Sequence, residues 1–250
     1  MEYAFFYEED KNTFHSQANI YFSQCGIDGL LSLHELLKIT SDIAVEDYRQ
    51  RGLAREFLKE NGFGILVSRC SFRIQKWPEE NQRVEIVTWE EKPQALQLMR
   101  GYTILDEKKN ILVAGKSSWL VVDMHARKIL PTKKFTLREP SETVAELDCD
   151  NPEKIIQPEN MELWNTRTIQ FSDLDANGHT TNSRYAAFIE DSLPAEFHGR
   201  CARDFKINFA KEAMLGEEVA LYGYVDAARN RVTVAGKTPS SVSFEAVLLY

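Results

Sequence analysis

The chain has 250 residues, of which 43% are hydrophobic and 11% aromatic, enough to build a core without disulfides or a structural metal. Its 38 acidic residues outnumber its 30 basic residues, for a formal net charge of −8. This balance excludes a general nucleic-acid binder, because neutralising phosphates requires a basic surface.

The start of the chain and the cysteines indicate the compartment. MEYAFFYEEDK has no basic segment followed by a long apolar one, and no stretch approaches the roughly 20 apolar residues of a membrane span. The four cysteines have no C-x-x-C spacing, so neither a zinc site nor a redox pair is indicated. We expect a soluble, cytoplasmic protein without stable membrane insertion, whose cysteines are reduced and buried.

The first half predicts one long helix followed by an antiparallel meander. Residues 30–48 place apolar side chains on one broad helical face, at Leu30, Leu33, Leu37, Ala44 and Tyr48. Four β-rich runs follow at residues 64–77, 83–91, 95–106 and 110–123. The turn-forming segments PEEN, EKPQ and DEKKN separate these runs.

The second half repeats this order after a polar, acidic, proline-containing segment at residues 136–160, which we interpret as a linker. A strand is predicted at residues 163–171 and a helix from about Thr181 to Leu193, ending near Pro194. Further strands are predicted at residues 204–212, 218–225, 231–236 and 242–250.

Matching residues at a fixed offset indicate an internal repeat. Phe22-Ser23 lies 149 positions before Phe171-Ser172, and Gly29 lies equally far before Gly178. We therefore predict an α+β fold of two tandem hot-dog domains, each a long helix packed on an antiparallel sheet, at residues 1–135 and 161–250. Side by side, they would share one continuous sheet. Two unrelated α+β domains are the alternative.

Residues 173–178 read D-x-D-x-N-G, which is the first half of a calcium-binding EF-hand loop. The twelfth position of that loop should be a bidentate glutamate, but it is Arg184, whose charge would repel the ion. We therefore expect no metal here. A capped helix start is a second interpretation, with Thr180, Thr181 or Asn182 as the cap.

Helix capping does not explain His179, although a histidine with a purely structural hydrogen bond is an alternative. Asp175, Asn177 and His179 alternate along the chain, so in an extended segment all three would face one side. They would then meet just before a helix whose free N–H groups can polarise a carbonyl oxygen.

The segment DLDANGHTTNSRY, residues 173–185, resembles the D-x-N-x-H-x-N-N-x-x-Y segment of acyl-acyl carrier protein thioesterases. These are tandem hot-dog enzymes that end fatty acid synthesis. LVSR, TW, RGYTILD and AGKSSWLVVDMHARK in the first half resemble further markers of that family. The resemblance extends from about residue 14 to the C-terminus.

The resemblance implies catalysis by Asp175, Asn177, His179 and Glu212, the last in FAKEAML on a predicted strand. Glu212 or His179 would be the general base, Asn177 would hold the carbonyl group or the water, and Asp175 would orient its neighbours. Where the family often has cysteine after this glutamate, the chain has Ala213, which favours direct attack by water. An exposed strand glutamate without a catalytic role is the alternative for Glu212.

The first copy has Gly26, Asp28 and Leu30 at the aligned positions, so it cannot carry the same chemistry. We expect the domain at residues 1–135 to supply the acyl pocket, and the domain at residues 161–250 the catalytic groups. Apolar side chains of the first half are candidates for the lining of that pocket, namely Leu33, Leu37 and Ile65. The family often has tryptophan at the last of these positions.

The implied reaction is hydrolysis of fatty acyl-acyl carrier protein to free fatty acid and holo carrier protein, without cofactor or metal. The partner is the carrier protein with its phosphopantetheine-linked chain; a homodimer is also compatible with the sequence. A basic rim could steer an acidic carrier, formed by Lys133, Lys134, Arg200, Arg203 and Lys206. The alternatives are an enoyl-thioester hydratase on the same fold and a non-catalytic acyl-binding regulatory protein.

Overall fold

The structure, a computed structural model, describes residues 4–7 and 12–250. Its strands are β1 (Ala4–Tyr7), β2 (Thr13–Asn19), β3 (Phe63–Ile74), β4 (Arg83–Glu91), β5 (Leu98–Leu105), β6 (Ile111–Asp123), β7 (Lys128–Leu130), β8 (Glu162–Thr168), β9 (Asp204–Phe209), β10 (Glu218–Asp226), β11 (Arg231–Thr238) and β12 (Ser241–Leu249). The α-helices in these residues are α1 (Leu33–Gln50), α2 (Arg55–Glu60) and α3 (Asn182–Ser192).

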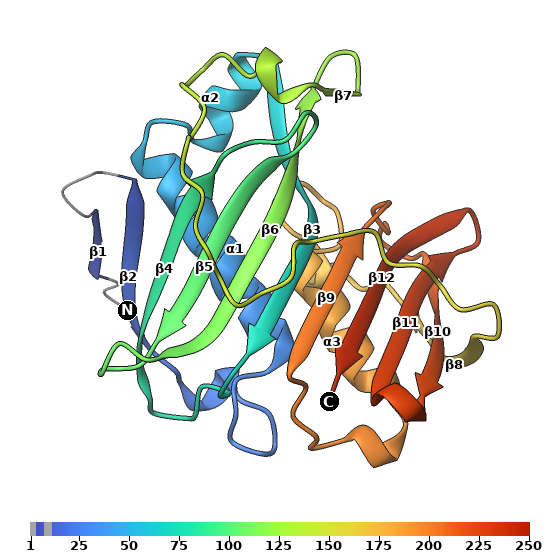
Figure 1. Cartoon of the computed structure of the whole chain (residues 1–250). Coiled ribbons are helices and arrows are strands. Elements are labelled where there is room, and N and C mark those ends of the chain that lie inside the picture. Colours follow the sequence, from blue (N-terminus) through green and yellow to red (C-terminus); the bar gives the residue numbers. More distant parts are fainter. Residues whose placement is uncertain (1–3, 8–11) are drawn as a thin grey trace.

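Within the described residues the strands form one sheet in the order β1-β2-β4-β5-β6-β3-β9-β12-β11-β10-β8, with β7 paired to β6. Helices α1 and α3 both pack on one face of this sheet, each over its own half of the chain (Figure 1). The predicted α+β fold of two tandem hot-dog units with a shared sheet is confirmed.

The two halves meet at the antiparallel pair of β3 and β9. Phe72 and Phe205 are opposite each other there, and their rings stack with centroids 6.5 Å apart. Phe72 begins FRI (residues 72–74) and Phe205 begins the similar FKI (residues 205–207), so similar segments of the two halves pair in antiparallel orientation at this seam. One apolar core continues beneath both helices and across the seam.

Helix α1 begins where Ser32 accepts a hydrogen bond from the Glu35 N–H group, a standard N-cap. Its apolar stripe lies against the sheet, with Leu36, Ile43 and Ala44 almost fully buried. Among the described residues, no helix combines the length and apolar character that crossing a bilayer requires.

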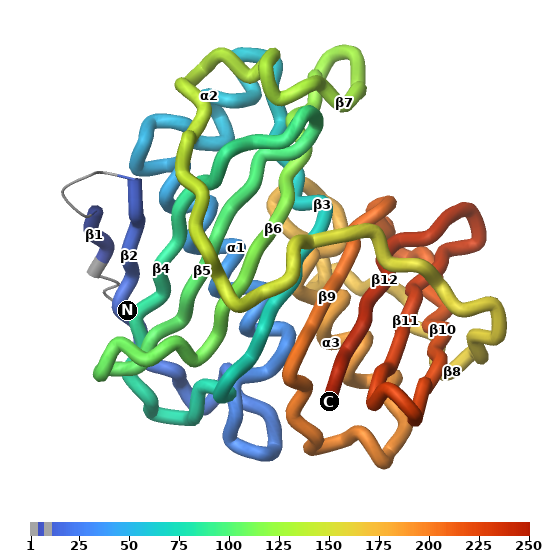
Figure 2. The backbone as a smooth tube through the Cα atoms, viewed as in Figure 1, coloured from blue at the N-terminus to red at the C-terminus, as the bar shows by residue number. Residues whose placement is uncertain are grey.

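Residues 136–160 cross the face of the sheet opposite the helices, as the tube in Figure 2 shows. Asp148 pairs with Arg73 of β3 at 3.2 Å, and Asp150 pairs with Lys206 of β9 at 2.6 Å. The linker is therefore fastened to both halves beside their seam.

Several elements differ from the sequence-based prediction. Strands β1, β2 and β7 and helix α2 were not predicted, and β9 ends at Phe209 rather than at residue 212. The Ala210 N–H group still donates to the Ser243 carbonyl of β12, and the Ala213 carbonyl then accepts from Thr180, in the loop before α3. All four cysteines are free as predicted, but Cys201 is exposed, so the expectation that all are buried was wrong.

Candidate active site

The loop at residues 174–180, between the short 3-10 helix η3 (Phe171–Asp173) and α3, is a tight turn. Leu174 and Thr180 form an isolated β-bridge, and the Asp175 N–H group donates to the His179 carbonyl at 2.8 Å. Gly178 has φ +80, the left-handed region that glycine adopts without steric cost. The predicted extended conformation was therefore wrong, because the glycine folds the chain back.

The first half contains the same turn. Cys25 and Leu31 form the equivalent bridge, the Gly26 N–H group donates to the Leu30 carbonyl at 2.8 Å, and Gly29 has φ +74. Each residue lies 149 positions before its counterpart in the second half. The backbone has been kept in both copies, while only the second copy presents an imidazole and a carboxamide.

The Asp175 carboxylate organises the turn from inside. Its Oδ1 accepts the N–H groups of Asn177 at 2.7 Å and of His179 at 3.3 Å. Its Oδ2 accepts the Asn177 side-chain Nδ2 at 3.3 Å. One carboxylate thus fixes the positions of both other polar residues in the turn, which an aspartate can do over such short spacings.

The structure brings Glu212 to this turn from the loop after β9. Its Oε1 lies 3.2 Å from His179 Nδ1, with the His179 side chain 33% and the Glu212 side chain 50% exposed. The residue after Glu212, Ala213, is held by Thr180. The Thr180 N–H group and Oγ1 donate to the Ala213 carbonyl at 3.2 Å and 2.7 Å. The Ala213 N–H group donates to the Tyr185 hydroxyl at 3.1 Å.

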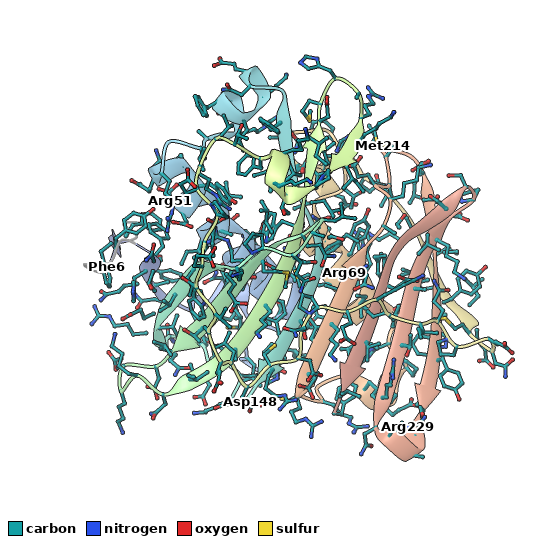
Figure 3. All side chains as sticks on the ribbon, turned by 45° about the horizontal axis from the view of Figure 1, so that its top comes forward. Phe6, Arg51, Arg69, Asp148, Met214 and Arg229 are labelled. Atoms are coloured by element: carbon teal, nitrogen blue, oxygen red, sulfur yellow. The ribbon has the colours of Figure 1, made fainter. Side chains whose placement is uncertain are left out.

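The four predicted catalytic residues therefore lie together, although Glu212 is in a loop and not on the predicted strand. In Figure 3 the top of Figure 1 is turned toward the reader. Met214, two residues after Glu212, is labelled in this view. The imidazole and the carboxylate are both open to solvent at this end, as a site for an incoming water molecule requires.

Asp173 supports the turn and was considered in the sequence only as a calcium ligand. It is fully buried, and its carboxylate accepts the Gln170 N–H group at 2.9 Å and Arg184 Nε at 2.8 Å. Burial raises the pKa of Asp173, but these bonds and the nearby Arg167 outweigh it and hold that pKa below its ordinary value. Arg184, eleven positions after Asp173, was the residue in the sequence that could have indicated this ion pair.

A cavity of about 130 Å³ lies between α1, the sheet and the start of α3. Its apolar walls come from both halves, mainly Leu37, Cys70, Phe72, Tyr102, Trp119 and Phe209. Asp175 lines it as well, so the cavity reaches the turn that carries His179. Lys38 and Asp42 also line it, so the cavity combines mainly apolar walls with a few polar and charged groups, as small-molecule sites do.

Of the three predicted pocket residues, only Leu37 lines this cavity. Leu33 is buried in the main core, and Ile65 packs on a second apolar cluster formed by Leu53, Leu58, Leu98, Val121 and Phe135. Trp119 packs against both clusters and also lines the cavity.

A larger cavity of about 570 Å³ lies between the linker and the first half. Its walls include Arg51, Glu90, Arg138 and Glu142, and none of the described residues of the turn at 174–180 contributes to it. Charged walls do not suit an acyl chain, so size alone does not identify the site.

The start of α3 differs from the capped helix start expected from the sequence. Among the described residues, no side chain caps it at Thr181, and the Thr180 hydroxyl bonds Ala213 instead. Asn182 and Ser183 of the first turn line the cavity. The partially positive end of the helix is therefore directed at the space where a ligand would lie.

The predicted basic residues do not form one rim. The segment after β7, which contains Lys133 and Lys134, lies at the top of Figure 1, whereas the segment between α3 and β9, which contains Arg200 and Arg203, lies at the bottom. Arg203 pairs with Asp204, and Lys206 with Asp150 on the outer face. Only the lysine pair remains a candidate for steering a partner to the site.

Sequence models of the two acyl-ACP thioesterase domains match the chain, the N-terminal domain over residues 11–136 and the C-terminal domain over residues 157–238. Acyl-[acyl-carrier-protein] hydrolase FATB2, chloroplastic, of Cuphea viscosissima is 23% identical over 206 residues, covering 75% of this chain and 49% of that protein. Palmitoyl-acyl carrier protein thioesterase, chloroplastic, of Gossypium hirsutum is 22% identical over 227 residues, covering 78% and 54%. The chain spans about half the length of the curated relatives it matches.

Solved structures show the same fold. An acyl-ACP thioesterase from Bacteroides thetaiotaomicron superimposes with a TM-score of 0.80 at 22% identity, covering 98% of this chain and 99% of that one. The 12:0-ACP thioesterase from Umbellularia californica gives 0.76 at 14% identity, covering 95% and 96%. Because the two domain models together match well over half of the sequence, this chain belongs to the acyl-ACP thioesterase family.

Proposed function

We propose that this protein hydrolyses fatty acyl-acyl carrier protein to free fatty acid and holo carrier protein, and so ends fatty acid synthesis. One observation carries the proposal: the contact between His179 and Glu212 lies on the turn whose Asp175 lines an apolar cavity. An acyl chain in this cavity would have its thioester beside the titratable pair. The matching relatives, named as acyl-carrier-protein hydrolases, support this assignment.

His179 is the proposed general base. With the proton on Nδ1, directed at Glu212 Oε1 3.2 Å away, Nε2 keeps its lone pair for the proton of water. The water oxygen attacks the thioester carbonyl carbon, the carbon–sulfur bond breaks, and the leaving thiolate takes the proton back from the imidazolium. General acid–base catalysis of this kind contributes roughly 10²–10⁴ in rate.

The other two polar residues have positioning roles in this mechanism. The Asn177 carboxamide can bind the attacking water or the carbonyl group, since Asp175 holds it at the surface of the turn. Asp175 fixes the backbone N–H groups of Asn177 and His179. It therefore keeps the imidazole facing Glu212 without taking a proton itself.

A cysteine nucleophile is disfavoured by the surroundings of the residues involved. The position after Glu212 is Ala213, whose methyl group is fully buried. Cys70 lines the cavity, but burial raises the pKa of its thiol to about 12. The thiol therefore stays protonated near neutral pH, where only a thiolate would attack. Direct attack by water is the remaining route.

The proposed division of labour assigns the acyl pocket to residues 1–135 and the catalytic groups to residues 161–250, joined by the linker 136–160. The cavity of about 130 Å³ is close to the roughly 150 Å³ that encloses one benzene molecule. It would thus hold about six carbon atoms of a chain. Longer chains require displacement of Trp119 toward the second apolar cluster, where Ile65 lies.

The proposed partner is the carrier protein with its phosphopantetheine-linked acyl chain. The segment after β7, which contains Lys133 and Lys134, lies at the same end of its half as the loop after β9 with Glu212 does (Figure 1), so the two lysines can attract an acidic carrier. Cytoplasmic location and a homodimer stay predictions from the sequence.

Turnover of saturated acyl-carrier thioesters, followed by release of free thiol, tests this function. We expect thiol release by the wild type and a loss of at least about a hundredfold in His179→Ala and Asn177→Ala. His198→Ala, an exposed histidine at the opposite end, is the matched control and should keep the wild-type rate. Wild-type turnover in either site variant would contradict the assignment.

An enoyl-carrier substrate separates the two alternative functions. Loss of enoyl absorbance without thiol release would identify a hydratase. Tight binding of acyl thioesters without any turnover would identify an acyl-binding protein instead. Both results differ from hydrolysis, which must release one thiol for each fatty acid formed.

A further inference from the structure

Ser183 is a buried residue whose hydroxyl group has no hydrogen-bond partner among the described residues. Only 4% of the residue is exposed. Its backbone is engaged, because its carbonyl lies 2.9 Å from Nδ1 of His34, the residue 149 positions earlier in the repeat. A buried hydroxyl without a partner lowers stability, so its presence calls for a specific reason.

The position of Ser183 supplies that reason. It is the second residue of α3 and lines the cavity together with Asp175 and Asn182. None of the other described residues with an unpaired buried side-chain atom lines this cavity. Within the described part of the chain, no acceptor takes the N–H groups of Asn182 and Ser183. The unpaired backbone N–H groups and the unused hydroxyl therefore belong to residues that line one cavity.

A second serine of the same helix shows that the unpaired state is not imposed by the helix. Ser192 is also buried, at 6% exposure, and its hydroxyl donates to the Ile189 carbonyl at 2.9 Å. At the other end of α3, the carbonyl four residues before Ser183 belongs to His179 and already accepts the Asp175 N–H group. His179 lies before the first residue of α3, so Ser183 has no carbonyl of a preceding helical turn to bond, unlike Ser192.

We propose that the Ser183 hydroxyl donates a hydrogen bond to the carbonyl oxygen of the bound acyl thioester. The inference rests on the proposed thioester substrate. As water attacks the carbonyl carbon, the carbonyl oxygen gains negative charge, and fixed donors in a partly dry cavity stabilise that charge. The free N–H groups at the positive end of α3 act on the same oxygen.

Ser183 acts in this role as a donor and not as a nucleophile. A serine nucleophile requires a base within hydrogen-bonding distance to take its proton. Among the described residues, no side chain is bonded to this hydroxyl, so nothing activates it for attack. Its proton stays on the oxygen throughout, and no bond to Ser183 forms or breaks.

The test compares Ser183→Ala with Ser192→Ala, using binding of two acyl-pantetheine analogues that cannot be hydrolysed. In the ketone analogue a methylene group replaces the thioester sulfur and the carbonyl is kept. In the thioether analogue a methylene group replaces the carbonyl. Binding is measured by calorimetry, and stability by the midpoint of thermal unfolding.

We expect Ser183→Ala to bind the ketone about tenfold more weakly and the thioether as the wild type does, since one hydrogen bond is lost. Its unfolding midpoint should stay the same or rise, because an unpaired buried hydroxyl is removed. Ser192→Ala should bind both analogues normally and unfold at a lower temperature.

Equal binding of the ketone by Ser183→Ala and the wild type would overturn the inference. Parallel weakening of both analogues with a lower midpoint would also overturn it, by showing a structural role. These binding results do not depend on turnover. The wild type could bind the ketone more tightly than the thioether and yet release no thiol from acyl carriers. That result would refute the proposed hydrolysis but not the proposed Ser183 hydrogen bond.

Discussion

Glu190 links the two helices across the seam and provides a sharp test through pH. It lies in the last turn of α3, and its Oε1 accepts the Leu33 N–H group at the start of α1 at 3.1 Å. Burial raises the pKa of Glu190 to about 7, although hydrogen bonds from the Leu33 and His34 N–H groups oppose the shift. The charges of Asp191 and Asp28 raise it further.

The raised pKa of Glu190 sets the sign of the change in stability with pH. The folded protein holds the Glu190 proton more tightly than the unfolded chain, whose ordinary value is 4.5. The stability contributed by this group is therefore complete below about pH 4.5 and is lost as the pH rises through about 7. The loss amounts to about 3 kcal/mol at most, from 1.36 kcal/mol for each pKa unit.

Glu190→Gln removes the charge and keeps a side-chain oxygen that can accept the Leu33 N–H group. We expect this variant to be more stable than the wild type by about 2–3 kcal/mol at pH 8 and by well under 1 kcal/mol near pH 4.5. Urea unfolding of both proteins from pH 4.5 to pH 8 measures the difference directly.

Glu196→Gln is the matched control, because Glu196 is exposed in the loop just after α3 and its difference from the wild type should not change with pH. A difference between wild type and Glu190→Gln that is the same at pH 5 and pH 8 would refute the reasoning. It would show that burial between the helices does not perturb this carboxyl group.

Two further predictions concern the support of the turn and the end of the cavity. Asp173→Asn should lower the free energy of unfolding by about 1.5–3 kcal/mol, because the buried side chain loses its charge beside the partly exposed Arg184; an unchanged urea midpoint would contradict this. Trp119→Leu should shift turnover toward longer saturated acyl carriers, because it opens the cavity toward Ile65. Competition between chain lengths measures the shift, and an unchanged preference would mean that Trp119 does not close the pocket.

The sequence determined most of the regular elements because their patterns are local. A run rich in β-branched and aromatic residues between turn-forming segments located β4 at Arg83–Glu91, the same bounds as the predicted strand. The helical stripe located α1, and the offset of 149 residues predicted a tandem fold that the structure confirms. Short or edge elements such as β1, β7 and α2 carry too few residues to show a period.

The candidate site was only partly available from the sequence. The motif singled out Asp175, Asn177 and His179, but their conformation was predicted as extended. Gly178 reverses the chain by adopting φ +80, and the Asp175 carboxylate then fixes the turn. A pattern of alternating residue types contains no information on that reversal, since glycine is compatible with both conformations.

Tertiary structure alone decided which distant residues meet. Glu212 reaches His179 because the Ala213 carbonyl bonds Thr180, and the unpaired state of Ser183 depends on the walls around it. The raised pKa of Glu190 likewise arises only when α3 packs beside the start of α1. Periodicity follows from neighbours along the chain, whereas burial, pairing and cavities depend on contacts between segments that are distant in it, 33 residues for Thr180 and Ala213 and 157 for Leu33 and Glu190. These contacts exist only in the folded protein.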